Sequence, residues 1–294
     1  MSSQEFVRAG AGLGHGLGHG LGGMVVTAVG YRSRGAPPTL HRGLPSPYLT
    51  LIFSLDGPVV SGGTPEQARG PGASRTEIVV GGLHQRPAYI VQPGREAGVQ
   101  LAVHPLAART LLGLPAGALA SDLVTSGADV LGKRAAEVWE RLCEQRAWGD
   151  RFATLGAYLR ERAAEGEDGA PVRSEVTEAW AWLARHRGAG TLKGLAEHVS
   201  LGPRRLTSVF RAETGLSPKQ AARLMRFQHA RNTVVRAVAA GRAPDLARAA
   251  ADCGYFDHSH LVRDFRQYTG VSPTAWLAEE CRNIQAGGHL YGEE

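Results

Sequence analysis

The basic side chains of this 294-residue sequence are concentrated in one C-terminal segment. Residues 185–285 contain 16 lysines and arginines against 8 acidic residues, a net charge of +8, whereas residues 1–184 contain 17 of each sign. Ammonium and guanidinium groups gathered in one module are typical of a site for a polyanion such as a nucleic acid. The chemistry that the charges predict is therefore contact with phosphate groups.

Histidines offer a second kind of chemistry, which is metal binding. His41, His84 and His104 would form a cupin-like metal triad if the fold brought them together, but nothing in their spacing requires it. His15 and His19 lie in a low-complexity Gly/Leu/His stretch, where each binding event would have to order a flexible chain. We therefore expect no metal site, and the cupin-like enzyme remains the alternative that metal analysis tests.

Catalytic motifs do not accompany the strand–helix junctions of the sequence. G-x-S-x-G, the Walker A loop and the G-x-G-x-x-G dinucleotide fingerprint are all missing there. The cysteines lie far apart without C-x-x-C spacing, which argues against a thiolate zinc site and against a disulfide framework. The sequence predicts a protein of the reducing cytoplasm that is not an enzyme, has no cofactor and does not enter a membrane.

An internal repeat organises the basic segment. FRAETGLSP, beginning at Phe210, recurs as FRQYTGVSP, beginning at Phe265, with six of nine positions identical at an offset of 55. The same offset, extended backwards without a gap, aligns Leu206 with Leu261 and residues 195–197 with residues 250–252. The repeat unit is therefore longer than the motif itself.

Each copy predicts two helices joined by a short turn. A short helix (residues 192–199 or 246–253) is followed by an N-cap, Gly202 or Asp257, and by a second helix that ends at Gly215 or Gly270. This is the helix-turn-helix arrangement, whose second helix enters the major groove of DNA. A continuous helix over residues 218–238 joins the copies and spans about 30 Å, close to the spacing of adjacent major-groove segments.

With this repeat, residues 174–282 resemble the DNA-binding domain of the AraC/XylS family of bacterial transcription regulators. The resemblance covers a little over a third of the chain, and it departs from the family pattern at Gly202, Ser208, Leu261 and Leu277. Its signature consists of Cys253-Gly254-Tyr255, Asp257-His258-Ser259, Arg263-Asp264-Phe265-Arg266 and Gly270-Val271-Ser272-Pro273, with Arg226 and Arg231 on the linking helix.

The resemblance implies which side chains contact DNA. Those expected to read base edges are Arg204, Thr207, Ser208, His258, Ser259, Val262 and Arg263. Those expected to contact phosphates are Arg205, Arg211, Arg226, Arg266 and Gln267. Arg204 and Arg263 are the strongest candidates for specificity, because a guanidinium pairs bidentately with guanine O6 and N7.

The N-terminal half predicts strands followed by helices. Short β-rich segments at residues 24–29, 48–55, 77–80, 88–91 and 99–103 are separated by Gly/Pro clusters, and helical patterns follow at residues 105–112, 130–145 and 150–162. We therefore expect an α+β chain in which a β-sandwich or barrel-like domain with trailing helices precedes an all-helical domain with two helix-turn-helix motifs.

The expected domain organisation has five parts. They are a disordered Gly/His-rich tail (1–23), an effector-binding or dimerisation domain (24–162), a linker (163–173), the DNA-binding domain (174–285) and a tail (286–294). The partners implied by the resemblance are double-stranded DNA, a small-molecule effector, a second copy of the chain and, if the protein is an activator, RNA polymerase. A non-specific architectural DNA-binding protein is the other alternative.

Overall fold

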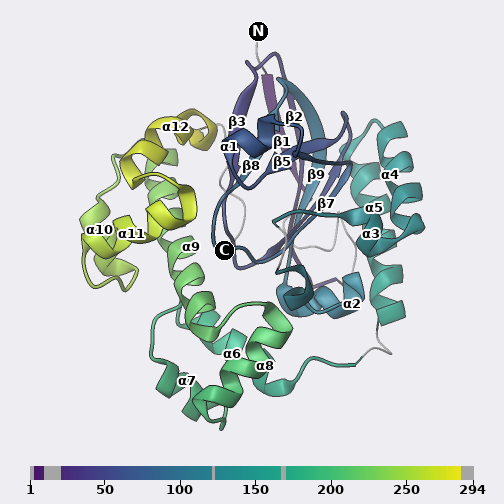
Figure 1. Cartoon of the computed structure of the whole chain (residues 1–294). Helices are drawn as coiled ribbons and strands as arrows, with labels where there is room; N and C mark the ends of the chain where they lie inside the picture. The colour runs from purple at the N-terminus through teal and green to yellow at the C-terminus, as the bar shows by residue number, and fades with distance from the viewer. Residues whose placement is uncertain (1–2, 10–20, 121–122, 167–169, 286–294) are drawn as a thin grey trace.

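The computed structural model describes residues 3–9, 21–120, 123–166 and 170–285. Figure 1 shows a region of strands flanked by helices, built from the first half of the chain, and a wholly helical region built from the second half. The predicted α+β class, with a sandwich-like part before an all-helical part, is confirmed. No helix in those ranges is long and apolar enough to cross a lipid bilayer.

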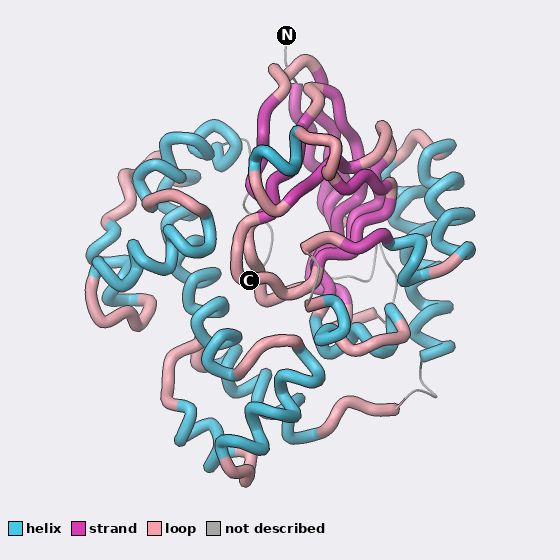
Figure 2. Tube along the Cα trace, in the orientation of Figure 1, coloured by secondary structure: helices cyan, strands magenta, loops and turns pink. Residues whose placement is uncertain are grey.

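The strands form two antiparallel sheets that stay open instead of closing into a barrel (Figure 2). The first sheet has the order β1 (Ser3–Arg8), β2 (Val25–Arg34), β9 (Arg95–Val103), β4 (Leu49–Ser54), β7 (Ile78–Gly81) and β10 (Thr125–Ser126). The second has the order β3 (Thr39–Gly43), β8 (Ala88–Gln92), β5 (Val59–Gly62) and β6 (Ser74–Thr76). The predicted strands correspond to β2, β4, β7, β8 and β9.

Helices connect and follow the strands. A short helix lies between β5 and β6, and the others come after β9. They are α1 (Pro65–Arg69), η1 (Pro105–Ala107), α2 (Ala108–Leu112), η2 (Ala116–Leu119), α3 (Gly127–Leu131), α4 (Lys133–Glu144) and α5 (Trp148–Gly166). The single helix predicted over residues 130–145 is wrong, because Gly132 adopts a φ of +74° that separates α3 from α4.

Alternation along the first sheet gives it one apolar face and one mixed face. In β4, Leu49, Leu51 and Phe53 are buried on one side, whereas Thr50 and Ser54 are on the other. The apolar face packs against the trailing helices, since Trp148 of α5 lies over Gly30 of β2 and Ile78 of β7 contacts Gly127 of α3. The mixed face is turned toward the second sheet, and this leaves a cavity between the sheets.

Two expected boundaries differ from the structure. Residues 3–8, assigned to a disordered tail, form β1, which pairs with β2 in the register Phe6↔Tyr31. The Gly/Leu/His stretch at residues 10–20, with His15 and His19, lies outside the described residues. The linker expected from residue 163 begins later, because α5 continues to Gly166 with Ala163 buried.

The C-terminal part consists of seven helices within the described ranges. They are α6 (Ser174–Arg185), α7 (Leu192–His198), α8 (Pro203–Thr214), α9 (Pro218–Ala239), α10 (Leu246–Asp252), α11 (His258–Thr269) and α12 (Pro273–Gln285). The predicted caps are confirmed, since Gly215 and Gly270 have φ of +78° and +81° at the ends of α8 and α11. Two helix-turn-helix motifs joined by the long helix α9 are therefore present, as predicted.

Candidate nucleic-acid interface and ligand cavity

The first module, α7 and α8, presents its predicted base-reading residues on an exposed face. Arg204 and Ser208 are exposed and Thr207 is half-buried, with its hydroxyl donating to the Pro203 carbonyl at 2.8 Å. Leu206 and Phe210, one turn apart, are fully buried and fix the opposite face of α8. The apolar pair therefore orients α8 so that its polar side faces outward.

The second module, α10 to α12, presents the equivalent face of α11. His258, Ser259 and Arg263 are exposed and Val262 is half-buried. At the offset of 55, Arg204 corresponds to Ser259 and Ser208 to Arg263, so each helix has one arginine among its predicted base-reading residues, placed one turn apart in the two copies. The two modules therefore present different donors, and we expect them to read different bases.

The turns of the two modules differ by one residue. Both first helices have seven residues, but α7 begins at Leu192 and α10 at Leu246, an offset of 54 instead of 55. The gapless alignment of residues 195–197 with 250–252 is therefore wrong. The additional residue in the second turn is Phe256, whose side chain is 93% exposed just before the Asp257 cap of α11.

The predicted phosphate contacts divide into two groups. Arg205, Arg211 and Arg266 are exposed, and Gln267 is half-buried. The prediction for Arg226 is not supported, because its guanidinium donates to main-chain carbonyls inside the domain, Gly188 at 3.1 Å and Gly254 at 3.4 Å. Arg226 thus connects α9 to the loop after α6 and to the turn of the second module.

An ion pair that the sequence analysis missed joins α9 to the second module. The Asp264 carboxylate is fully buried and accepts from Arg223 at 2.6 Å, while the Arg223 guanidinium lies 5.5 Å from the centre of the Tyr268 ring. The signal in the sequence is an acidic residue next to Phe265 on the apolar stripe of α11, where a charge requires a partner.

Two of the three histidines weighed for a cupin-like metal triad take part in local hydrogen bonds. His104 caps η1, with Nδ1 accepting from the Leu106 amide at 3.2 Å, and His84 lies with its Nδ1 against the Arg86 carbonyl. Burial lowers the pKa of both imidazoles. Among the described residues, His, Cys, Asp and Glu form no group of three or more arranged to hold a metal ion.

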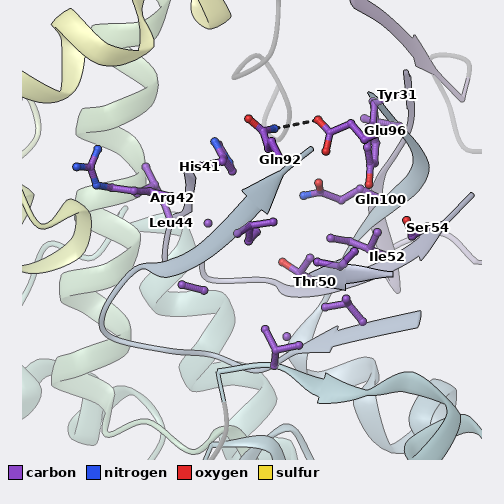
Figure 3. Close-up of a pocket in the computed structure, with 18 of the residues that line it drawn as sticks. Tyr31, His41, Arg42, Leu44, Thr50, Ile52, Ser54, Gln92, Glu96 and Gln100 are labelled. Atoms are coloured by element: carbon purple, nitrogen blue, oxygen red, sulfur yellow. Dashed lines mark hydrogen bonds between the residues drawn. The ribbon is translucent and has the colours of Figure 1, made fainter. Parts of the chain in front are cut away.

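A cavity of about 300 Å³ lies between the two sheets (Figure 3). The mixed face of the first sheet supplies Tyr31, Thr50, Glu96 and Gln100 to its wall, where a closed sandwich core would have aliphatic side chains. The α9 helix adds Gln228, so the DNA-binding part forms some of the same wall. The cavity is thus bounded by both parts of the chain.

The polar end of the cavity is centred on a half-buried carboxyl group, that of Glu96. Gln92 of β8 donates to Glu96 of β9 at 2.9 Å across the space between the sheets, as the dashed line in Figure 3 marks. Burial raises the pKa of Glu96, and burial together with the Glu96 charge raises the pKa of the Tyr31 hydroxyl. Gly98 makes room for Tyr31, because a Cβ there would lie 2.5 Å from the phenol oxygen.

The helical part of the chain matches a known domain family. The helix-turn-helix domain family matches residues 195–279, which run from α7 into α12 and include both copies of the repeat. No curated protein sequence matches the chain.

Several solved structures are similar in part. ToxT from Vibrio cholerae has a TM-score of 0.49 at 8% identity, over 85% of this chain and 97% of that chain. The DNA-binding domain of AdpA, a global transcriptional factor solved with a target DNA, has a TM-score of 0.33 at 24% identity, over 38% and 96%. The AraC-like transcriptional activator CuxR has a TM-score of 0.29 at 14% identity, over 82% and 97%.

The family match covers both helix-turn-helix motifs, the long helix between them and the quoted signature residues from Cys253 to Pro273. The chain therefore carries, at residues 195–279, a DNA-binding helix-turn-helix domain of the AraC/XylS family of transcription regulators.

Proposed function

We propose that the chain is a sequence-specific transcription regulator in which residues 174–285 read DNA and residues 24–162 bind a small-molecule effector. The observation that supports DNA reading is the exposure of donors on equivalent faces of two helices that are each anchored by buried apolar residues. If these side chains were only solvated surface charges, they would not have to lie on the same face of α8 and α11.

The proposed contacts follow from side-chain chemistry and exposure. Arg204 and Arg263 donate to guanine, and the exposed hydroxyls of Ser208 and Ser259 contribute less discrimination. Contacts to phosphates come from Arg205, Arg211, Arg266 and Gln267. Phosphate contacts release counterions, so we expect the affinity to fall steeply as the salt concentration rises.

The effector site that we propose is the cavity between the sheets. Gln228, 2% exposed on α9, lines it with a carboxamide oxygen that has no hydrogen-bond partner in the described part of the chain. A buried acceptor without a partner costs free energy in the empty state, so a ligand that donates a hydrogen bond to it is favoured. The mixed polar and apolar wall suits a small molecule with both kinds of surface.

The test of DNA reading begins with selection of a bound duplex from a random library. We expect Arg263→Ala to weaken binding to the selected duplex by about 1–3 kcal/mol and to relax the preference at one position. Arg134→Ala is the matched control, because Arg134 is an exposed arginine on α4 that pairs with Glu161 at 3.0 Å. Equal affinity of the wild type for selected and random duplexes at one salt concentration would instead indicate an architectural DNA-binding protein.

Three further parts of the proposal rest on the family resemblance. The protein has no catalytic activity, forms a homodimer through residues 24–162, and contacts RNA polymerase if it activates transcription. Sedimentation velocity of the full chain at micromolar concentration tests the second part, and a strict monomer contradicts it. Metal analysis of the purified chain tests the first against the cupin-like alternative, since a stoichiometric metal would favour an enzyme.

A further inference from the structure

The N-terminal part contacts both helix-turn-helix modules at equivalent positions of the repeat. Glu213 and Tyr268 correspond at the offset of 55, as do the helix-ending glycines Gly215 and Gly270, and each of these four residues lies against the N-terminal part. The contacts therefore involve the C-terminal ends of α8 and α11. The base-reading residues lie on the exposed face of each helix and stay uncovered.

The first interdomain contact joins the first module to η1, α2 and η2. Arg109 of α2 donates to both carboxylate oxygens of Glu213, at 2.9 and 3.0 Å, and the Glu213 side chain is 8% exposed. Gly117 of η2 lies against the end of α8, where a Cβ would be 2.6 Å from the Ala212 carbonyl oxygen. His104 packs edge-on against Trp180 of α6 at 5.9 Å.

The second interdomain contact joins the second module to β3, β8 and the segment before β8. Tyr268 donates to Gln85 at 3.5 Å, and Gly270 lies beside the Tyr89 hydroxyl. Arg42 of β3 pairs with Glu279 of α12 through its two terminal guanidinium nitrogens, of which Nη2 lies 3.5 Å from Oε1. This contact is built from strands, whereas the first is built from helices.

The strands of the second contact are also a wall of the cavity. β3 pairs with β8 in the register His41↔Ile90 and Arg42↔Tyr89, and successive side chains of a strand point to opposite faces. His41, Arg42 and Ile90 all line the cavity, and His41 also lies with its Nδ1 3.9 Å from a carboxylate oxygen of Glu280 on α12. The pair β3–β8 therefore contacts both the cavity and the second module.

The first contact has no such connection, because its residues on α2 and η2 are not part of the cavity wall. The α9 helix adds a route that again leads to the second module. Gln228 lines the cavity, and the preceding residue, Phe227, packs against Phe265 at 5.1 Å and Tyr268 at 4.7 Å. Both elements shared by the cavity and the DNA-binding part thus contact α11 or α12, and α9 also packs against α6 and α8, so the connection through β3–β8 is the one specific to the second module.

We propose that occupancy of the cavity alters the attachment of the second module alone, while the first module stays attached to η1, α2 and η2. This inference rests on the proposed effector site. β3 is the edge strand of the second sheet, so it is paired on one side only and able to shift when a ligand packs against His41 and Ile90. A ligand would then change the half of the DNA site that α11 reads and leave the half read by α8 unchanged.

Hydrogen exchange of the full-length chain tests whether the two contacts are independent. Arg42→Ala should raise the exchange rates of α11 and α12 by about fivefold and leave α8 unchanged, and Arg109→Ala should do the reverse. Arg134→Ala is the control and should change neither. If Arg42→Ala and Arg109→Ala each raise exchange in both modules, the modules are attached as one unit and the proposal is wrong.

A cavity-filling variant, Ile52→Trp, tests the link to occupancy, because Ile52 lines the cavity from β4 and takes part in neither contact. In this variant the hydrogen-exchange rates should increase in α11 and α12 only. An increase in α8 would overturn the link between occupancy and the second module. Unchanged exchange rates in a variant with the melting temperature of the wild type would also overturn it. If Ile52→Trp does not fold, Gln100→Trp, which fills the cavity from β9, replaces it, with the expected increase again confined to α11 and α12. Binding of wild type to its selected duplex is measured alongside, since its failure would refute DNA reading but not the independence of the contacts.

Discussion

Replacing Arg223 by Met tests the ion pair that holds α11 to α9. The Asp264 carboxylate is fully buried, and its Oδ1 accepts from Arg223 at 2.6 Å. Removing the guanidinium leaves a buried charge without compensation, which costs about 3–5 kcal/mol in comparable sites. Because the Arg223 side chain is 34% exposed and partly screened by water, we expect the lower end of that range.

Urea unfolding followed by circular dichroism measures this loss. The double variant Arg223→Met/Asp264→Leu removes both charges and should recover most of the stability, because well-packed apolar replacements of a buried pair are often neutral. Asp264→Asn should cost less than Arg223→Met, since the charge that it leaves unpaired is on Arg223, which is 34% exposed to water, and not on a fully buried carboxylate. The reasoning is refuted if Arg223→Met loses less than about 1 kcal/mol, or if the double variant is less stable than the single one.

Three further outcomes follow from burial and backbone geometry. Since burial lowers the pKa of His104, the unfolded chain takes up its proton first as the pH falls below about 6.5, so stability drops with falling pH. His104→Asn, which keeps a capping side chain, should reduce the drop in melting temperature between pH 7 and pH 5; an unchanged drop contradicts this. Gly188→Ala should cost at least about 2 kcal/mol in urea unfolding, because φ is +72° and a methyl group would overlap the Ala222 carbonyl oxygen; a smaller loss argues against that geometry. Trp276→Ala should cost about 3–5 kcal/mol and Phe256→Ser less than about 0.5, because the first side chain is fully buried and the second almost fully exposed; similar losses would contradict this assignment.

The helix-turn-helix part was predictable because its information is local and occurs twice. Pro203 at the start of one helix, and Gly215 and Gly270 at the ends of two, set the bounds of α8 and α11 through backbone conformation alone. The extra residue in the second turn was missed, since a gapless alignment of short alanine-rich helices looks acceptable at either offset. The N-caps of these two helices, Thr191 and Asp245, show that their offset is 54.

The N-terminal part was less predictable because its determinants are distant in sequence. β1 is polar along much of its length and becomes a strand only through pairing with β2, and β3 depends in the same way on β8. The positions of Arg226 and Arg223 depend on segments 28 to 41 residues away, so no local pattern reveals that these arginines face inward. Likewise, the cavity exists because the two sheets present polar side chains to each other. The sequence of either sheet alone does not indicate this arrangement.

The extra residue in the second turn makes the two copies of the repeat unequal as building blocks. A duplication that yields identical modules allows one to be exchanged for the other, but Phe256 lengthens the chain between α10 and the Asp257 cap of α11. A chimera with the first module's turn, Ser200-Leu201-Gly202, in the second position would have one residue fewer to reach the same helix start. The modules therefore form an ordered pair, and recombination within the repeat would preserve the fold only where the crossover keeps the local offset, which is 54 in the first helices and 55 in α8 and α11.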